Sequence, residues 1–183
     1  MAGLSVSVHS EISEIPCAHW NALLTREDNP FVDWRFLAAL EQSGSASPES
    51  GWMACHFAVR RGTELVAVAP AYIKDGSDGD FSRDWEWAAA AERARIPYYP
   101  KLVVGIPFTP VSGRRILFAS GVSSSEQASI LELIVAAARE LMRRHGLGTV
   151  QVLFSNAQQN AQLVEQGLCA RIDFQYHFVN PGY

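Results

Sequence analysis

The clearest pattern of apolar and polar positions predicts a helix over residues 123–146. Ser123, with Glu126 three residues on, forms a capping-box sequence at its start. Arg143, Arg144 and His145 suit the negative end of the helix dipole, and Gly146 suits the position just past the last turn. The apolar residues between these ends recur at helical spacing and mark one buried face: Ile130, Leu133, Ile134, Ala137 and Leu141.

A continuous apolar run from Lys101 to Ile106 lies between Pro100 and Pro107. A run of this length between two breakers predicts a central strand that is buried on both faces. The following residues, 108–115, cannot continue a regular ladder, because their prolines donate no backbone hydrogen bond and Gly113 allows positive φ. The chain is therefore expected to leave the strand in a stiff, basic loop.

Alternation of apolar residues and turn signals predict the remaining elements. They are a strand over residues 4–8, two short helices opened by Pro16 and Asp33, an antiparallel hairpin of residues 52–60 and 64–74, a helix over 85–95, a buried strand over 149–154, a helix over 156–167 and a final strand over 170–179. This order predicts an α/β (α+β) domain with a mixed central sheet flanked by helices.

Composition limits the class of protein. A chain of 183 residues with 48% hydrophobic content fits one domain with its own core. Its net charge of −4 argues against non-specific binding to nucleic acid, so we expect no DNA partner. Three scattered cysteines favour a reducing compartment, and the sequence has neither a secretory signal nor an apolar run that could span a membrane, so we expect a cytoplasmic protein.

Several segments resemble a bacterial family of FemAB-like proteins, which are described as peptidoglycan biosynthesis or recognition proteins. They are Asn29-Pro-Phe31, Trp85-Glu-Trp87, Tyr98-Tyr-Pro-Lys101, Pro107-Phe-Thr-Pro-Val111, Gly113-Arg114 and the terminal residues 175–183. The resemblance implies a GNAT-like acyl-CoA N-acyltransferase fold over a single domain, residues 1–183. Family members carry a second GNAT-like half, so the chain is expected to be the amino-terminal half of a longer two-domain protein.

The resemblance also implies where an acyl donor would bind. A GNAT fold holds the donor pyrophosphate on backbone N–H groups between its fourth strand and the next helix, which here means residues 109–125. The candidate donor-binding residues are Thr109, Val111, Gly113, Arg114 and Arg115. Gly113 would let a phosphate approach closely, and the two arginines and the positive end of the following helix would attract it. The alternative is a stiff surface loop with solvated arginines.

Residues 143–148 also match an RxxGxG acyl-CoA signature in form. We do not assign them to donor binding, because an anion there would meet the negative end of the helix dipole.

Candidate catalytic residues are Tyr99, Lys101 and His177. Tyr99 and Lys101 lie at the mouth of the central strand, where a phenol or amine could transfer a proton, although aromatic packing under a proline-rich loop explains them equally well. The histidines have no metal-ligand spacing, and the glycine position of a calcium loop is occupied by Asp80, so we expect no metal site.

Two function hypotheses follow. The first is an acyl- or aminoacyl-transferase of GNAT/FemAB type that moves an acyl group to an amine acceptor, with acyl-CoA or aminoacyl-tRNA as donor and no tightly bound cofactor. The second is a non-catalytic half that recognises a cell-wall precursor or a protein partner. The alternating apolar residues of segment 170–179 further predict self-association or a missing carboxy-terminal half that packs there.

Overall fold

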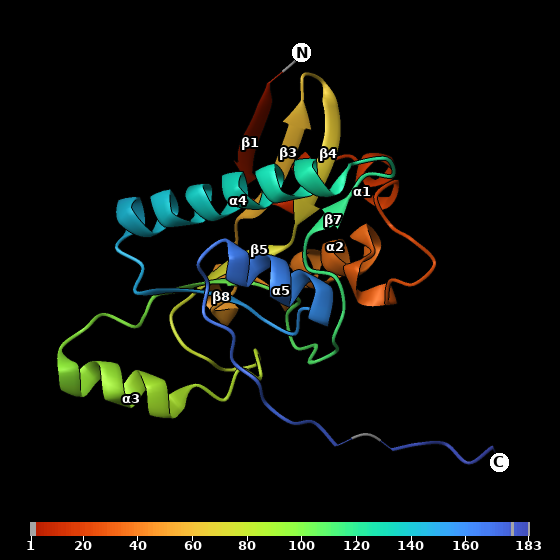
Figure 1. Cartoon of the computed structure of the whole chain (residues 1–183). Helices are drawn as coiled ribbons and strands as arrows, with labels where there is room; N and C mark the ends of the chain where they lie inside the picture. Colours follow the sequence, from red (N-terminus) through yellow and green to blue (C-terminus); the bar gives the residue numbers. More distant parts are fainter. Residues whose placement is uncertain (1–2, 177, 183) are drawn as a thin grey trace.

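A computed structural model of the chain describes residues 3–176 and 178–182 (Figure 1). The strands are β1 (Leu4–His9), β2 (Met53–Ala54), β3 (His56–Arg61), β4 (Glu64–Ala69), β5 (Ala71–Lys74), β6 (Lys101–Val104), β7 (Leu117–Phe118) and β8 (Thr149–Val152). The α-helices are α1 (Cys17–Asn21), α2 (Trp34–Gln42), α3 (Trp85–Ala94), α4 (Ser124–His145) and α5 (Ala157–Glu165). Three single-turn 3₁₀ helices complete the fold: η1 (Ile12–Glu14), η2 (Pro30–Val32) and η3 (Pro48–Ser50).

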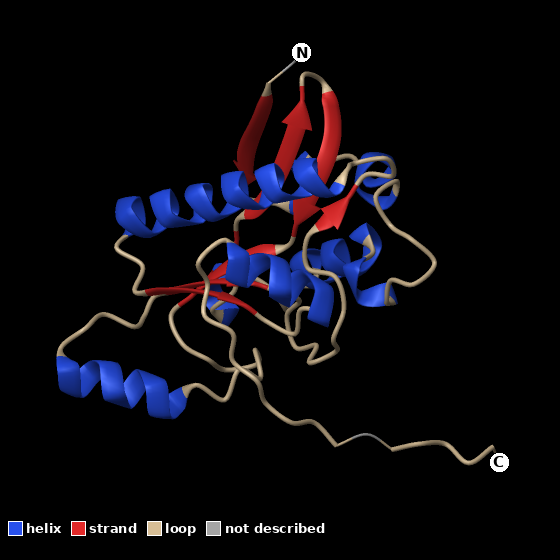
Figure 2. Cartoon of the chain, in the orientation of Figure 1, coloured by secondary structure: helices blue, strands red, loops and turns tan. Residues whose placement is uncertain are grey.

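The strands form two four-stranded sheets, ordered β1-β3-β4-β7 and β2-β5-β6-β8. The predicted hairpin is confirmed, since β3 and β4 pair antiparallel, and both of its arms continue into the second sheet as β2 and β5. The change of sheet falls at Cys55 and Pro70, where the amide of Cys55 donates to the carbonyl of Ala71 at 2.8 Å. The predicted mixed sheet flanked by helices is therefore present in two connected parts (Figure 2).

The central strand behaves as predicted. All four residues of β6 are buried, and the strand lies between β5, which is antiparallel to it, and β8, which is parallel. Leu102 and Val104 face the core under α4, whereas Val103 packs with Trp52 on the other side. Strand β8 differs from its prediction: its residues are only half-buried, because β8 forms the edge of its sheet.

Both ends of α4 lie where the sequence placed them. The hydroxyl of Ser123 accepts from the amide of Glu126 at 3.3 Å, and Gly146 ends the helix with φ of 66°. In a complete capping box the Glu126 carboxylate would also accept from the amide of Ser123, but here it pairs with Arg61 at 2.7 Å. Beside Gly146, Arg143 and Arg144 pair with Glu140 on the exposed last turn, which agrees with a helix stop in residues 143–148.

The predicted strand over residues 170–179 is wrong for the part of it that the structure describes. Residues 170–176 follow an extended path without a ladder, and Ile172 and Tyr176 are each 91% exposed. Alternation of apolar side chains indicates a face, but a strand also needs a neighbour for its backbone hydrogen bonds. No strand pairs with the described residues of this segment, whose contacts include side-chain bonds from Arg171 to the carbonyl of Arg83 at 3.0 Å and from Gln175 to that of Pro110 at 2.7 Å.

Among the described residues, no helix combines the length and the hydrophobicity that crossing a bilayer requires.

Candidate functional site

A cleft with a volume of about 560 Å³ opens where α4 and α5 begin. Its walls are the loop of residues 22–28, Gly113 and Arg114, residues 118–122 and the first turns of α5. Both helix N-termini therefore face one opening, and each offers backbone N–H groups that have no partner within the helix. This is a favourable place for an anionic or hydrogen-bonding ligand.

The cleft lies where two neighbouring chain segments enter different sheets. Strand β7 pairs with β4 in the first sheet, whereas β8 pairs with β6 in the second. Between them the buried side chain of Gln159 accepts from the amides of Arg115, at 2.7 Å, and Ile116, at 3.2 Å, and donates to the carbonyl of Ile116 at 2.5 Å. One side-chain amide thus satisfies the backbone of residues 115 and 116, next to the parallel bridge by which Gly113 joins Ser155.

Side-chain amides dominate the helical wall of the cleft. The lining residues of this type are Gln127, Asn156, Gln158, Gln159 and Gln162. Two of them bond to each other across the two helices, with Gln162 donating to Gln127 at 3.2 Å. Because an amide both donates and accepts, this wall suits a ligand that carries amides or hydroxyls rather than one held by charge alone.

Arg114 lines the cleft but its charge is matched. Its guanidinium contacts both carboxylate oxygens of Asp28, with Nε at 2.8 Å from Oδ1, and donates to the carbonyl of Leu23 at 3.0 Å. Burial acts to raise the pKa of Asp28, but the hydrogen bonds from Arg114 and Thr25 outweigh it and lower that pKa overall. The pair therefore ties the loop of residues 22–28 to the segment before β7.

Arg115 points away from the cleft into the protein and has no exposed surface. It donates to the carbonyls of Leu153, at 2.8 Å, Arg114, at 3.2 Å, and Val111. Burial lowers the pKa of Arg115 to about 10. The solvated-arginine alternative is thus wrong for this residue, because its guanidinium closes the proline-rich loop onto the end of β8.

The other predicted donor-binding residues occupy different positions. Thr109 is buried and donates to the carbonyl of Pro107 at 2.9 Å, while Val111 is exposed. Gly113 lines the cleft, and a Cβ at this position would lie 2.6 Å from the side-chain nitrogen of Asn29. The structure therefore brings Gly113 and Arg114 to the cleft and leaves Thr109 and Val111 outside its lining, and a donor-binding role for the set stays a prediction.

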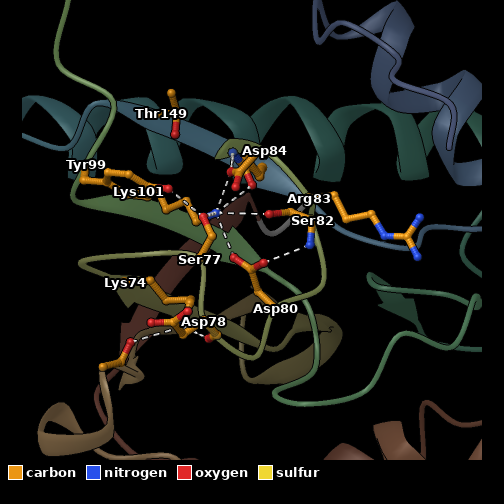
Figure 3. A network of polar contacts seen from close by, with 12 residues as sticks. Lys74, Ser77, Asp78, Asp80, Ser82, Arg83, Asp84, Tyr99, Lys101 and Thr149 are labelled. Atoms are coloured by element: carbon orange, nitrogen blue, oxygen red, sulfur yellow. Dashed lines mark hydrogen bonds and ion pairs between the residues drawn. The ribbon is translucent and has the colours of Figure 1, made fainter. Parts of the chain in front are cut away.

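Tyr99 and Lys101 lie together in a polar network at the start of β6, where Lys101 is buried (Figure 3). The ammonium of Lys101 is 2.7 Å from a carboxylate oxygen of Asp80, 2.7 Å from one of Asp84 and 2.6 Å from the hydroxyl of Ser77. The phenol of Tyr99 is 2.7 Å from the same Ser77 hydroxyl.

This network is distant from the cleft. Lys101 is completely buried and begins β6, whereas the cleft lies beyond the far end of the parallel strand β8. At about 3.3 Å per strand residue, the intervening length of sheet is on the order of 10 Å. The catalytic roles of Tyr99 and Lys101 stay predictions, and His177 lies outside the described residues.

Asp84 is the centre of the network that sequence reasoning missed. Besides Lys101, it accepts from the phenol of Tyr98 at 2.8 Å and from the side-chain amide of Gln151 at 2.9 Å. Burial disfavours its charge, but these bonds together hold the pKa of Asp84 well below its ordinary value. Burial and the Asp84 charge raise the pKa of Tyr98 in turn. The available signal was the acidic loop that precedes α3, close in sequence to two strand lysines.

The low pKa of Asp84 predicts acid sensitivity. A carboxyl group whose pKa is lower in the folded than in the unfolded state stabilises the fold above the unfolded pKa, which is about 3.9, and this stabilisation is lost as pH falls toward the folded pKa. We expect the stability difference between wild type and Asp84→Asn to stay constant from pH 6 to about pH 5 and to shrink as the pH falls through about 4 toward 2.5. Urea unfolding at a series of pH values measures this difference, and a difference that stays constant over the whole range would contradict the assignment.

Comparison with known proteins agrees with the fold. Residues 11–183 match the model of the FemAB-like family, described as peptidoglycan biosynthesis/recognition. Aminoglycoside 6'-N-acetyltransferase AAC(6')-Ih from Acinetobacter baumannii superposes with a TM-score of 0.53 and 13% identity, covering 98% of this chain and 100% of that one. Ribosomal-protein-alanine N-acetyltransferase from Brucella melitensis biovar Abortus 2308 gives 0.50 and 11%, covering 97% and 99%.

No curated protein matches the sequence. The two solved structures establish the fold alone, because their sequence identity to this chain is low, whereas the family match spans nearly the whole chain. The chain therefore belongs to the FemAB-like family and has the fold of the GNAT N-acetyltransferases.

Proposed function

We propose that this chain binds an acyl-CoA in the cleft between α4 and α5 and transfers the acyl group to an amine, in an acyltransferase of GNAT type. The observation that carries the proposal is the cleft itself, which opens at two helix N-termini beside the buried side chain of Gln159. The GNAT fold of the chain supports the same location, since a GNAT donor lies at the start of the helix that follows the parted strands.

The lining chemistry fits the parts of such a donor. The pantetheine arm of CoA carries two amide groups, which Gln127, Gln158 and Gln162 could bind through complementary hydrogen bonds. The pyrophosphate would lie at the start of α4, on backbone N–H groups next to Ser120 and Gly121. Because Arg114 is paired with Asp28, the phosphates would depend on these N–H groups more than on arginine charge.

The charge balance favours acyl-CoA over aminoacyl-tRNA as donor. Binding of a folded RNA needs many contacts between basic side chains and phosphates. The described charged residues that line the cleft are Glu27, Asp28 and Arg114, and the whole chain has a net charge of −4. A single CoA pyrophosphate needs far fewer positively charged side chains than a folded RNA does.

The reaction would join an amine to the donor carbonyl. The amine nitrogen attacks the thioester carbon, the C–N bond forms, the C–S bond breaks, and the proton lost by the amine leaves with the CoA thiol. Positioning and donation of a hydrogen bond to the carbonyl oxygen supply most of the catalysis in such a step. The family description favours a peptidoglycan precursor as the source of the amine. The proton-transfer roles of Tyr99, Lys101 and His177 stay predictions, because Tyr99 and Lys101 lie at the other end of the sheet from the cleft.

Ser120→Glu tests the donor site. Ser120 is exposed, lines the cleft and lies just before α4, where a carboxylate suits the helix dipole but repels a phosphate. We expect acetyl-CoA to bind the variant at least tenfold more weakly than wild type, measured by calorimetric titration. Wild type at about 100 times its dissociation constant should gain roughly 2.7 kcal/mol of stability from the ligand.

Ser129→Glu is the matched control, because it adds the same charge at an exposed position further along α4. Equal loss of affinity in both variants would mean a general charge effect and would place the donor elsewhere. If acetyl-CoA binds neither variant nor wild type while a muropeptide does, the non-catalytic recognition hypothesis replaces this one.

A further inference from the structure

Helix α3 extends from the body of the protein as an arm (Figure 1). None of its side chains is buried, and both Trp85 and Trp87 are 62% exposed. An isolated helix of this length is marginal in water, and large exposed aromatic side chains on a fixed element are typical of interaction surfaces. Helix α3 is therefore the α-helix whose stability would gain most from contact with a partner.

The base of the arm is firmly held. Asp84, just before α3, is buried against Lys101 and accepts from the phenol of Tyr98, which follows the arm. On the return side, a Cβ at Gly148 would lie 2.6 Å from the carbonyl oxygen of Pro97, so the chain there rests directly on the backbone before β8. Both ends are thus fixed to the sheet, and the helix between them is presented in a defined direction.

One face of α3 is complementary in charge to the same face of a second copy of the helix. Glu86, Ala89, Ala90 and Arg93 have the spacing i, i+3, i+4, i+7 and so lie along one side of the helix. Glu86, Ala90 and Arg93 are exposed. When two copies of such a face meet antiparallel, Glu86 of each lies opposite Arg93 of the other, and the alanines between them allow the two backbones to approach closely.

We propose that α3 is a homodimerisation element, in which the arms of two copies of this chain pack antiparallel about a two-fold axis. The contact uses the same residues on both sides, as a two-fold interface requires. Trp85 and Trp87 flank the charged and small face and would cover the partner helix from either side. The arm does not suit an anionic membrane, because its exposed charges, Glu86, Glu92, Arg93 and Arg95, balance.

Charge reversal tests the pairing. Sedimentation equilibrium of the full chain should show a concentration-dependent dimer, and either Glu86→Arg or Arg93→Glu should weaken it at least tenfold, because each places like charges opposite each other. An equimolar mixture of the two variants should dimerise again, since one variant then carries only arginines at these two positions and the other only glutamates. A variant that had merely lost its helix would not be rescued by mixing.

Two controls separate this surface from others. Glu140→Arg reverses a charge on the exposed last turn of α4 and should leave the dimer intact. Phe174→Ser reduces the apolar character of the exposed segment near the C-terminus and should also leave it intact. A dimer that survives both single reversals on α3, a mixture that stays monomeric, or a dimer lost on Phe174→Ser with α3 unchanged would each overturn the proposal.

Discussion

Lys101→Met is expected to destabilise the fold by about 3–5 kcal/mol, the cost typical of removing one partner from a buried ion pair. The substitution leaves the carboxylates of Asp80 and Asp84 buried without the ammonium that both contact at 2.7 Å. Methionine fills nearly the same volume, so the loss reports charge rather than packing. Urea unfolding monitored by tryptophan fluorescence measures it.

Lys74→Met is the matched control for this experiment. Lys74 is the register partner of Lys101 on β5 and is also buried, but its ammonium lies 3.6 Å from the Trp52 ring centroid and donates to the carbonyl of Asp78 at 2.9 Å. Its removal leaves no carboxylate unpaired at hydrogen-bond distance, so we expect a cost of roughly 1–2 kcal/mol. Equal costs for the two lysines would show that Asp80 and Asp84 do not depend on Lys101.

Arg115→Met is expected to cost about 2 kcal/mol, even though the sequence places this residue in a basic loop. The change leaves the part-buried carbonyls of Leu153 and Val111 without the guanidinium that donates to both, and each group left unsatisfied costs about 1 kcal/mol, the lower end of the range for buried groups. Thermal and urea unfolding of the variant provide the measurement.

The neighbouring substitution Arg114→Met serves as the comparison. The Arg114 side chain is 20% exposed, and Asp28 lines the cleft and keeps its hydrogen bonds from Thr25 when Arg114 is removed, so we expect a smaller cost than for Arg115→Met. The reverse order of the two costs would be inconsistent with a structural role for Arg115. Loss of acetyl-CoA affinity in Arg114→Met without loss of stability would instead give Arg114 a direct part in donor binding.

Local patterns were sufficient for most of the fold. The caps and periodicity of α4, the breakers around β6 and the turn between β3 and β4 are all signals carried by residues close together in the chain. Each reports a backbone conformation that the nearby side chains favour by themselves. The segment 170–179 shows the limit of this approach, because its alternation describes side chains and a strand depends on a partner elsewhere.

The candidate site depended on contacts that sequence spacing does not encode. Arg114 and Asp28 are 86 positions apart, and Arg115 and Gln159 are 44 apart. Basic residues next to glycine are equally compatible with a phosphate loop, a solvated loop and a buried structural arginine, and burial alone decides among them. The side chain of Gln159, which shapes the cleft, has an ordinary helical context in the sequence and gave no signal of its position between two strands.

The two ends of the arm that carries α3 meet at one carboxylate, since Asp84 before the helix accepts from Tyr98 after it at 2.8 Å. A segment whose ends are joined in this way leaves the path of the chain before and after it unchanged, whatever its own length. Residues 85–96 could therefore differ in length or sequence between related chains without disturbing the sheet or the cleft. Related chains could then differ in how they dimerise through α3 without differing in the reaction at the cleft.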